Sequence, residues 1–396
     1  MNEVYLVDGL RSPIGRFGGA LAPLRATEIA TPVVTGLLAR TGLPATEVEQ
    51  VIAGLVLQDM TESNPARIVG QRVGVPDAAP AFTLNMQCAS GMAALVMAAR
   101  QVALGSVGCV LAVGMESMSN APYTVQGARW GLRLGHGRFT DSLEECKLAG
   151  SGMWGDPQTM IDVAERHARV DGVSRREMDE YAVVSHQRAI AAMEAGRFED
   201  ETVPVTVPHR GGPVVVARDE NPRADVSAER LAAMTPVREG GTITPGNASA
   251  HNDAAAAALV CDAATVARLG LEPIARIVVP GTAMVGCDPQ LMGYSCVLAA
   301  ESALAGAELS QDDVDLIECN EGFAVQMVAC ERKAKWPRER LNVDGGSVGL
   351  GHPVGMSGLR IVIHLAKALR QRDLRYGLAT VPAGSGLGTA VVLERA

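Results

Sequence analysis

Buried strands alternate with amphipathic helices along this chain. The apolar run VYLVDG (4–9) predicts a buried strand. Residues 26–41 predict a helix, because their apolar side chains recur every three or four positions and so share one face. Residues 43–56 predict a turn, a short helix and another strand. This alternation is typical of an α/β protein.

The pattern occurs twice. LPATEVEQVIAGLV (43–56) and LSQDDVDLIECNEG (309–322) carry apolar residues at identical spacing. Each copy is followed by a glycine-marked loop, a long helix and a buried strand, at 88–114 and again at 352–381. An α/β chain can show such similarity by chance, but a repeat of this length favours duplication. We expect two β-α-β-α-β halves with right-handed crossovers.

The middle of the chain differs from both halves. Residues 174–198 predict a helix that begins with a capping box, Ser174 with Glu177, and residues 208–225 are rich in turn formers. We interpret this region as an insertion that covers the site and helps to bind substrate. The expected organisation is therefore a first half at 1–118, an inserted loop domain at 119–250 and a second half at 251–396.

Composition narrows the class of protein. The 396 residues are 47% hydrophobic, which is enough for a large core. The net charge of −9 includes no basic run, which argues against nucleic acid and membrane surfaces as partners, so an anionic ligand would need a local basic site. The eight cysteines show no CxxC spacing, and we see neither a signal peptide nor a run of 18 apolar residues. We expect reduced thiols and a cytoplasmic location.

Cys88 is the candidate nucleophile. It lies in NMQCASGM, directly before a predicted long helix, and helix N-termini carry partial positive charge and free N–H groups. We expect this setting to lower the pKa of the thiol and to favour the thiolate. The small residues after Cys88 leave room for a substrate. The alternative is a structural cysteine at a tight turn.

Three further segments carry candidate chemistry. His352 lies in a loop, 345–358, of which half is Gly or Pro. It could act as the base that activates a cysteine. A metal role is weaker, because no second histidine lies at ligand spacing. Asn320 ends a buried strand and could hold a water or donate to an oxyanion, or serve only in a turn or cap. Gly384 and Ser385, in VPAGSGLG, could aim backbone N–H groups at an oxyanion.

Taken in order, these segments resemble the thiolase family over nearly the whole chain. GMESMSNAPY and GHPVGMSG are specific enough to make chance negligible. The segments that carry the resemblance are NPAR (64–67), QCASGMAAL (87–95), GMESMSNAPY (114–123), AGRFEDETVPV (195–205), GNASAHNDAAAA (246–257), DPQLMG (288–293), NEGFA (320–324) and GHPVGMSG (351–358).

The resemblance implies a thiolase fold, with two duplicated halves in a five-layered α-β-α-β-α core and an inserted loop domain, assembled as a homodimer or homotetramer. It implies that Cys88 accepts the acyl group, that His352 activates it, and that Asn320 holds a catalytic water and forms an oxyanion hole with His352. Coenzyme A thioesters would be substrates, with no permanently bound cofactor. The implied coenzyme A contacts are Arg223 near the nucleotide, Ser249 at the pantetheine arm and Met160.

This chain departs from the family pattern in three places. Thiolases carry a second cysteine, thirty residues after the GHP histidine, that removes the α-proton of the second acyl-CoA; here that position is Pro382, which has no titratable group. A related branch places the base cysteine at the alanine of NEAF, where this chain has Gly322. TMIDVAER (159–166) replaces an HMG-x-x-AE pattern, and Ala250–His251 replace a glycine and an apolar residue. We therefore expect an altered substrate shape.

Several reactions fit these residues. A thiolase would condense two acyl-CoAs or cleave a 3-ketoacyl-CoA through S-acyl-Cys88, but it would need a substitute for the missing base. A decarboxylative condensation forms its carbanion by expelling CO₂ and needs no base. Acyl transfer to an amine, an alcohol or a carrier thiol needs none either. A non-catalytic partner subunit is the remaining alternative, although such a scaffold has no need to keep Cys88, His352 and Asn320 together.

Overall fold

Ten strands form one hydrogen-bonded sheet system in the computed structural model, which describes residues 1–148 and 158–396. The first half contributes, in spatial order, β1 (Val4–Arg11), β10 (Asn252–Asp262), β5 (Cys109–Ser117), β3 (Gln50–Gly54) and β4 (Ala81–Leu84), with the short β2 (Gly15–Arg16) beside β10. The second half contributes β11 (Ala275–Gly286), β14 (Leu387–Arg395), β13 (Tyr376–Ala383) and β12 (Leu316–Cys319).

The two halves repeat one topology. In the first half, β10 is antiparallel to both β1 and β5, and β3 is parallel to β5. In the second half, β14 is antiparallel to both β11 and β13, and β12 is parallel to β13. The halves meet where β1 pairs with β11, at Val4 opposite Ile277. The duplicated α/β architecture expected from the sequence is confirmed.

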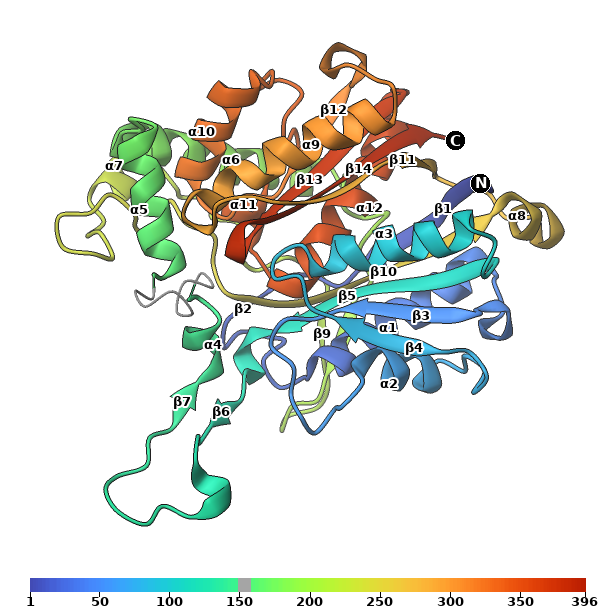
Figure 1. Cartoon of the computed structure of the whole chain (residues 1–396), viewed down its shortest axis with the longest axis horizontal. Coiled ribbons are helices and arrows are strands. Elements are labelled where there is room, and N and C mark those ends of the chain that lie inside the picture. The colour runs from blue at the N-terminus through green and yellow to red at the C-terminus, as the bar shows by residue number, and fades with distance from the viewer. Residues whose placement is uncertain (149–157) are drawn as a thin grey trace.

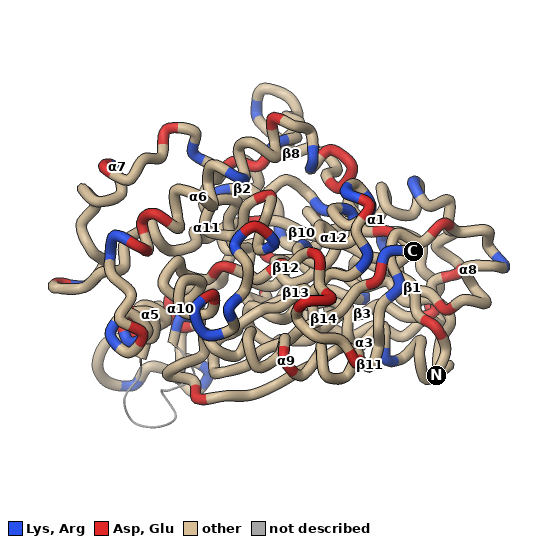
Figure 2. Tube along the Cα trace, turned by 90° about the horizontal axis from the view of Figure 1, so that it is seen from above, with Lys and Arg blue, Asp and Glu red and all other residues tan. Residues whose placement is uncertain are grey.

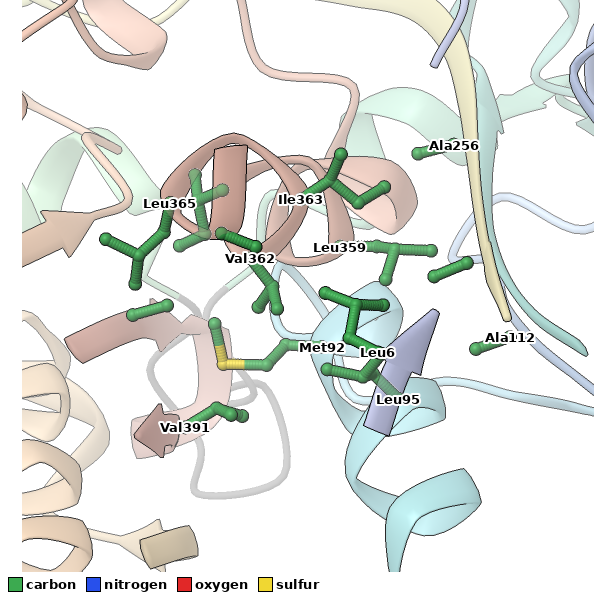
Figure 3. Packing of buried hydrophobic residues seen from close by; sticks show 14 of the residues in the cluster. Leu6, Met92, Leu95, Ala112, Ala256, Leu359, Val362, Ile363, Leu365 and Val391 are labelled. Carbon is green, nitrogen blue, oxygen red and sulfur yellow. The ribbon is translucent and has the colours of Figure 1, made fainter. Parts of the chain in front are cut away.

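Helices and sheets alternate in five layers (Figure 1). Outside the first sheet lie α1 (Ala26–Thr41) and α2 (Pro65–Arg72), and outside the second lie α9 (Ser295–Gly306) and α10 (Ala324–Ala334). The central layer holds α3 (Ser90–Ala103) and α12 (Val354–Arg372). Each helix layer has its own buried apolar cluster, and the central cluster draws side chains from both sheets. Figure 3 shows Met92 and Leu95 of α3 between Leu359 and Val362 of α12, Leu6 of β1 and Val391 of β14.

Glycines let the two central helices touch backbone to backbone. A Cβ added at Gly91 would lie 2.7 Å from the carbonyl oxygen of Gly355, and one added at Gly358 would lie 2.8 Å from the backbone nitrogen of Met92. No real Cβ sits that close to backbone, so a larger residue here would force the helices apart. Because Gly91 follows Cys88 by three residues and Gly355 follows His352 by three, this crossing brings the two candidate residues to the same end of the layer.

The strand β10 changes where the halves divide. It falls within 251–396, the range expected for the second half, yet it lies between β1 and β5 in the first sheet. The short α8 (Ala263–Leu269) follows it and the chain then enters β11. We therefore place the boundary between α8 and β11, because a strand belongs to the sheet that satisfies its backbone hydrogen bonds.

Helices of the inserted region 119–250 lie at one end of the layers (Figure 1), and residues 149–157 lie outside the described part of the chain. The hairpin β6 (Tyr123–Thr124) and β7 (Thr140–Asp141) projects as an arm. The helix expected at 174–198 is α6 (Arg175–Glu194), capped by Ser174 and Glu177 as predicted. The remaining elements are α4 (Ser142–Glu145), α5 (Met160–Val170), α7 (Ala228–Ala232), β8 (Val205–Val207) and β9 (Val214–Val216).

Shorter elements complete the chain. The four-residue helix α11 (Ser347–Leu350) precedes the His352 loop. Basic and acidic residues are interspersed along the tube in Figure 2. No helix in the described residues is long and apolar enough to cross a bilayer. The 3₁₀ turns are η1 (Ala45–Glu47), η2 (Met118–Asn120), η3 (Ala128–Trp130), η5 (Pro289–Tyr294), η6 (Gln311–Asp313) and η7 (Gly384–Gly386).

Candidate active site

A strained turn presents Cys88. The residue before it, Gln87, has φ +52°, a left-handed conformation that side chains other than glycine rarely adopt. Three hydrogen bonds hold the turn: Asn85 Oδ1 accepts from the Gln87 N–H at 2.9 Å, and Ser90 Oγ both donates to the Gln87 carbonyl at 2.6 Å and accepts from the Met86 N–H at 2.9 Å. The turn leaves the Cys88 side chain half-buried at the wall of a cavity.

This central cavity has a volume of about 450 Å³ and lies between the ends of α3 and α12 and the inserted region. It gathers side chains that are far apart in sequence, and most of the residues expected at the site are among them. Met118, Met292, Phe323 and other apolar residues form much of its wall, and no Asp or Glu is among its described lining residues. The expected residues that line it are Cys88, Met160, Arg223, Ser249, Asn320, His352 and Gly384.

Hydrogen bonds fix the orientation of His352. Its Nδ1 lies 2.7 Å from Ser357 Oγ, and this hydroxyl donates to the Pro353 carbonyl at 3.0 Å. A hydroxyl that donates elsewhere accepts from the ring, so Nδ1 carries the proton and Nε2 is left as a free base. The backbone N–H of His352 donates to Asn252 Oδ1 at 2.9 Å, which anchors the loop.

Asn320 faces the free nitrogen of His352. Its Nδ2 lies 3.5 Å from His352 Nε2, and its Oδ1 accepts from Ser347 Oγ at 2.8 Å. The serine hydroxyl thereby sets which way the amide points, with the NH₂ group toward the histidine. An amide N–H beside an unprotonated imidazole nitrogen is suited to hold a water, which accepts from the amide and donates to the nitrogen. Once Nε2 is protonated, the two groups could together donate to an oxyanion.

Both reacting groups are neutral at rest. Burial raises the pKa of Cys88 to about 11, and the backbone N–H of Gly384, which donates toward the sulfur, only partly opposes this. Burial lowers the pKa of His352 to about 3, and the positive charge of Arg360 lowers it further. The expectation that this setting makes Cys88 a thiolate is therefore wrong, because desolvation of the charged form outweighs the backbone hydrogen bonds that stabilise it.

Proton transfer must therefore accompany the reaction. Because the pKa of the thiol is raised and that of the imidazole is lowered, a resting thiolate–imidazolium pair is unfavourable before the attraction between the two charges is counted. That attraction is strong in a low-dielectric cavity, and an electrophile consumes the thiolate as it forms. The arrangement suits a cysteine that is deprotonated by His352 during attack.

A buried carboxyl group joins the segment after β3 to the start of α12. Glu116 accepts hydrogen bonds from the backbone N–H groups of Val56, Leu57 and Gly355, at 2.9–3.1 Å. Burial raises the pKa of Glu116 to about 7, so some of it is protonated at neutral pH. The residue lies in GMESMSNAPY, and the tether itself was not predicted because its partners are backbone groups distant in sequence.

Of the other expected residues, Ser249, Met160 and Arg223 line the cavity and Ser385 does not. Ser249 donates its hydroxyl to the Gly322 carbonyl at 2.9 Å, and Met160 begins α5, so both are placed by the inserted region and its flank. Arg223 lies at the exposed side of the cavity, and its backbone N–H donates a hydrogen bond to His186 Nδ1. Ser385 is not brought to the site: it has φ +63° in η7 and is not among the described residues that line the cavity.

Sequence reasoning missed two lining residues, Cys146 and Lys147, which follow α4. No motif marks them, and only the folded loop brings them to the cavity. Burial raises the pKa of Cys146 to about 12, with smaller contributions from Glu116 and Cys88, so this thiol lies within electrostatic reach of the nucleophile.

In the described residues, no group of three or more His, Cys, Asp or Glu side chains could hold a metal ion.

Comparison with known proteins identifies the family. Residues 4–264 match the model of the thiolase N-terminal domain and residues 271–395 that of the thiolase C-terminal domain. The chain therefore belongs to the thiolase family, and it is an acyltransferase enzyme with the thiolase fold.

Its relatives match over their full length. The chain is 43% identical to an acetyl-CoA acetyltransferase of Pseudomonas aeruginosa and 42% identical to a probable acetyl-CoA acetyltransferase of Escherichia coli, each covering 100% of both chains. Among solved structures, it resembles the acetyl-CoA acetyltransferase of Bacillus anthracis (TM-score 0.96, 39% identity, 100% and 99% covered). It also resembles human mitochondrial 3-ketoacyl-CoA thiolase (TM-score 0.95, 37% identity, 100% and 99% covered).

The pKa of Cys88 predicts how fast it is alkylated. At pH values well below a pKa of about 11, the thiolate fraction increases tenfold for each unit by which the pH is raised. The rate of Cys88 alkylation by iodoacetamide should therefore increase about tenfold per pH unit from pH 6.5 to 9.5. Peptide mass spectrometry can follow Cys88 separately from the other seven cysteines. A rate that levels off below pH 8 would show a resting thiolate and contradict this account.

Proposed function

We propose that the enzyme moves an acyl group from an acyl-CoA thioester through an S-acyl intermediate on Cys88. The supporting observation is that Cys88, His352, Asn320 and the N–H of Gly384 face one cavity. Cys88 Sγ attacks the thioester carbonyl while His352 Nε2 takes its proton; the C–S bond to coenzyme A then breaks, and the proton passes to the departing thiol. The N–H of Gly384 stabilises the negative charge on the carbonyl oxygen.

Coenzyme A enters as part of the substrate, and no permanently bound cofactor is needed for these steps. We assign Arg223 to the nucleotide end, where its exposed guanidinium can pair with a phosphate, and Ser249 and Met160 to the pantetheine arm. The cavity fits this division, because its apolar wall suits the arm and Arg223 at its exposed side suits the anionic end of the ligand.

The second half-reaction is where this chain differs. Thiolase chemistry is Claisen condensation or its reverse, thiolysis, and condensation of two acyl-CoAs needs a group that removes an α-proton. Pro382 stands where the family resemblance places that group, and it lines the cavity beside Cys88. Without a general base, this step loses a factor of about 10²–10⁴ in rate.

Pro382 therefore favours a second candidate function. In a decarboxylative condensation, loss of CO₂ from a 2-carboxyacyl-CoA leaves the carbanion that attacks S-acyl-Cys88, so no base is required. Acyl transfer to an amine, an alcohol or a carrier thiol would also proceed without it. A non-catalytic partner subunit is disfavoured by the intact hydrogen-bonded set of His352, Asn320 and Ser357.

The projecting arm supports the expected dimer or dimer of dimers. It carries large apolar side chains that are more than half exposed, and such a patch on a single chain favours burial against another copy. The oligomeric state and the cytoplasmic location stay predictions. The exposed apolar residues of the arm are Tyr123, Trp130, Leu132, Leu134 and Phe139.

Intact-protein mass spectrometry tests the intermediate. After incubation with acetyl-CoA and acid quench, the enzyme should gain one acetyl group, mapped to Cys88, and Cys88→Ala should gain none and lose all acyl transfer. Cys287→Ala removes another half-buried thiol outside the cavity and should behave as wild type. Turnover that persists in Cys88→Ala would refute the nucleophile.

Restoring a thiol at position 382 tests the missing base. Pro382→Cys should raise the rate of acetoacetyl-CoA thiolysis by at least about tenfold, because it returns an acid/base group to the cavity wall. Pro382→Ala is the matched control, since it removes the ring without adding a thiol, and it should give no such gain. Equal rates in the two variants would mean that Pro382 does not stand at the base position.

A further inference from the structure

The charges around the central cavity are one-sided. Two cationic side chains, Lys147 and Arg223, line it, together with the imidazoles of His251 and His352, whereas none of its described lining residues is acidic. This occurs in a chain whose net charge is −9. Arg223 is accounted for by the phosphate end of coenzyme A, but the reaction as derived above uses neither Lys147 nor His251.

Lys147 lies on the nucleophile side of the cavity. Its neighbour Cys146 lines the same wall within electrostatic reach of Cys88. The Lys147 carbonyl accepts a hydrogen bond from the N–H of Met160 at 2.8 Å, which fixes this loop against the start of α5. Its ammonium is paired with Glu144, 2.5 Å away, and the side chain is only 27% exposed whereas that of Glu144 is 66% exposed. Because an ammonium has three donors, Lys147 keeps donors for a second anion besides Glu144.

His251 lies near both Lys147 and His352. Burial lowers the pKa of His251, and the charge of Lys147 lowers it further, against weaker opposing effects of Glu144 and Asp141. His251 in turn contributes to lowering the pKa of His352. Its backbone is held by the Phe17 N–H at 3.1 Å, and its ring packs edge-on against the Phe17 ring at 6.1 Å.

An uncharged acyl chain would leave both groups without a ligand partner in a cavity whose walls are largely apolar. A carboxylate would instead accept a charge-assisted hydrogen bond from Lys147 and another from His251, which strengthen as the bound ligand excludes water. An anion also lowers the cost of keeping an ammonium and an imidazole side by side.

We propose that the acyl end of the central cavity binds acyl groups that carry a carboxylate, paired with Lys147 and His251. This inference rests on the proposed transfer through Cys88 and adds the substrate class. The carboxylate could be the α-carboxylate of a malonyl group, which a decarboxylative condensation would expel, or the terminal carboxylate of a longer dicarboxylic acyl group that is kept in the product.

Single-turnover acylation of the full chain distinguishes these cases. The rate of S-acyl-Cys88 formation, per concentration of acyl-CoA, is measured by intact mass spectrometry for pairs of equal carbon number: malonyl- with propionyl-CoA, succinyl- with butyryl-CoA, and glutaryl- with pentanoyl-CoA. Condensation with an acetylated enzyme is measured in parallel, with malonyl-CoA as acceptor. We expect at least a tenfold preference for the carboxylated member in one pair, or product from malonyl-CoA as acceptor.

Variants then assign the preference to its residues. Lys147→Met should lower the carboxylated-to-uncharged rate ratio, or the malonyl-CoA acceptor rate, at least tenfold, and Lys147→Arg should restore most of it. His251→Asn should lower it by a smaller factor. Lys335→Met removes an exposed lysine far from the cavity lining and should leave the ratio as in wild type.

The outcomes separate the two proposals. Acylation of Cys88 without preference in any pair and without product from malonyl-CoA, or a ratio unchanged in Lys147→Met, would overturn the carboxylate site and leave the acyl-enzyme standing. No acylation by any acyl-CoA, charged or uncharged, would overturn the proposed acyl-enzyme and the carboxylate site with it.

Discussion

The backbone contact between α3 and α12 is the constraint on which the site depends. Gly91 and Gly355 allow the two helices to approach until only a hydrogen fits between them. Each helix is preceded by a loop that carries one reacting group, Cys88 or His352, at the same distance from its glycine. A duplicated strand–loop–helix unit thus becomes an active site when its two copies cross at their glycines. The surrounding sheets hold that crossing from both sides.

Cys88 and His352, the two candidate reacting groups, carry no charge at rest. Burial keeps Cys88 protonated and His352 neutral, so little of the reactive thiolate is present at rest. The polar groups around them are already oriented. Ser357 fixes the tautomer of His352, Ser347 fixes the orientation of the Asn320 amide, and the Gly384 N–H points toward the Cys88 sulfur. Such preorganisation costs no rearrangement at the moment of reaction.

The elements and the roles were predictable to different degrees. Strands and helices such as 4–9, 26–41 and 174–198 follow from periodicity and caps, since these are local properties of the sequence. That Cys88, Asn320 and His352 share one cavity followed from the repeat and from the family motifs.

The features that the sequence did not predict depend on the packed fold. The pKa of Cys88 was misjudged because the helix dipole can be read from sequence whereas desolvation requires the packed structure. Likewise β10 completes the first sheet although it follows the insertion, and nothing local in its alanine-rich run shows which sheet it joins. Lys147 and Cys146 reach the cavity only through the path of the loop after α4, so no spacing rule finds them.

The central proposal is that Cys88 and its partners transfer acyl groups, and that Pro382 stands where the family resemblance places a proton-removing thiol. The most direct test is to identify, by mass spectrometry, the products formed from acetyl-CoA alone and from acetyl-CoA with malonyl-CoA. This account predicts that condensation product forms quickly only when malonyl-CoA is present. Rapid formation of acetoacetyl-CoA from acetyl-CoA alone would contradict it, and would show that another group in the cavity removes the α-proton.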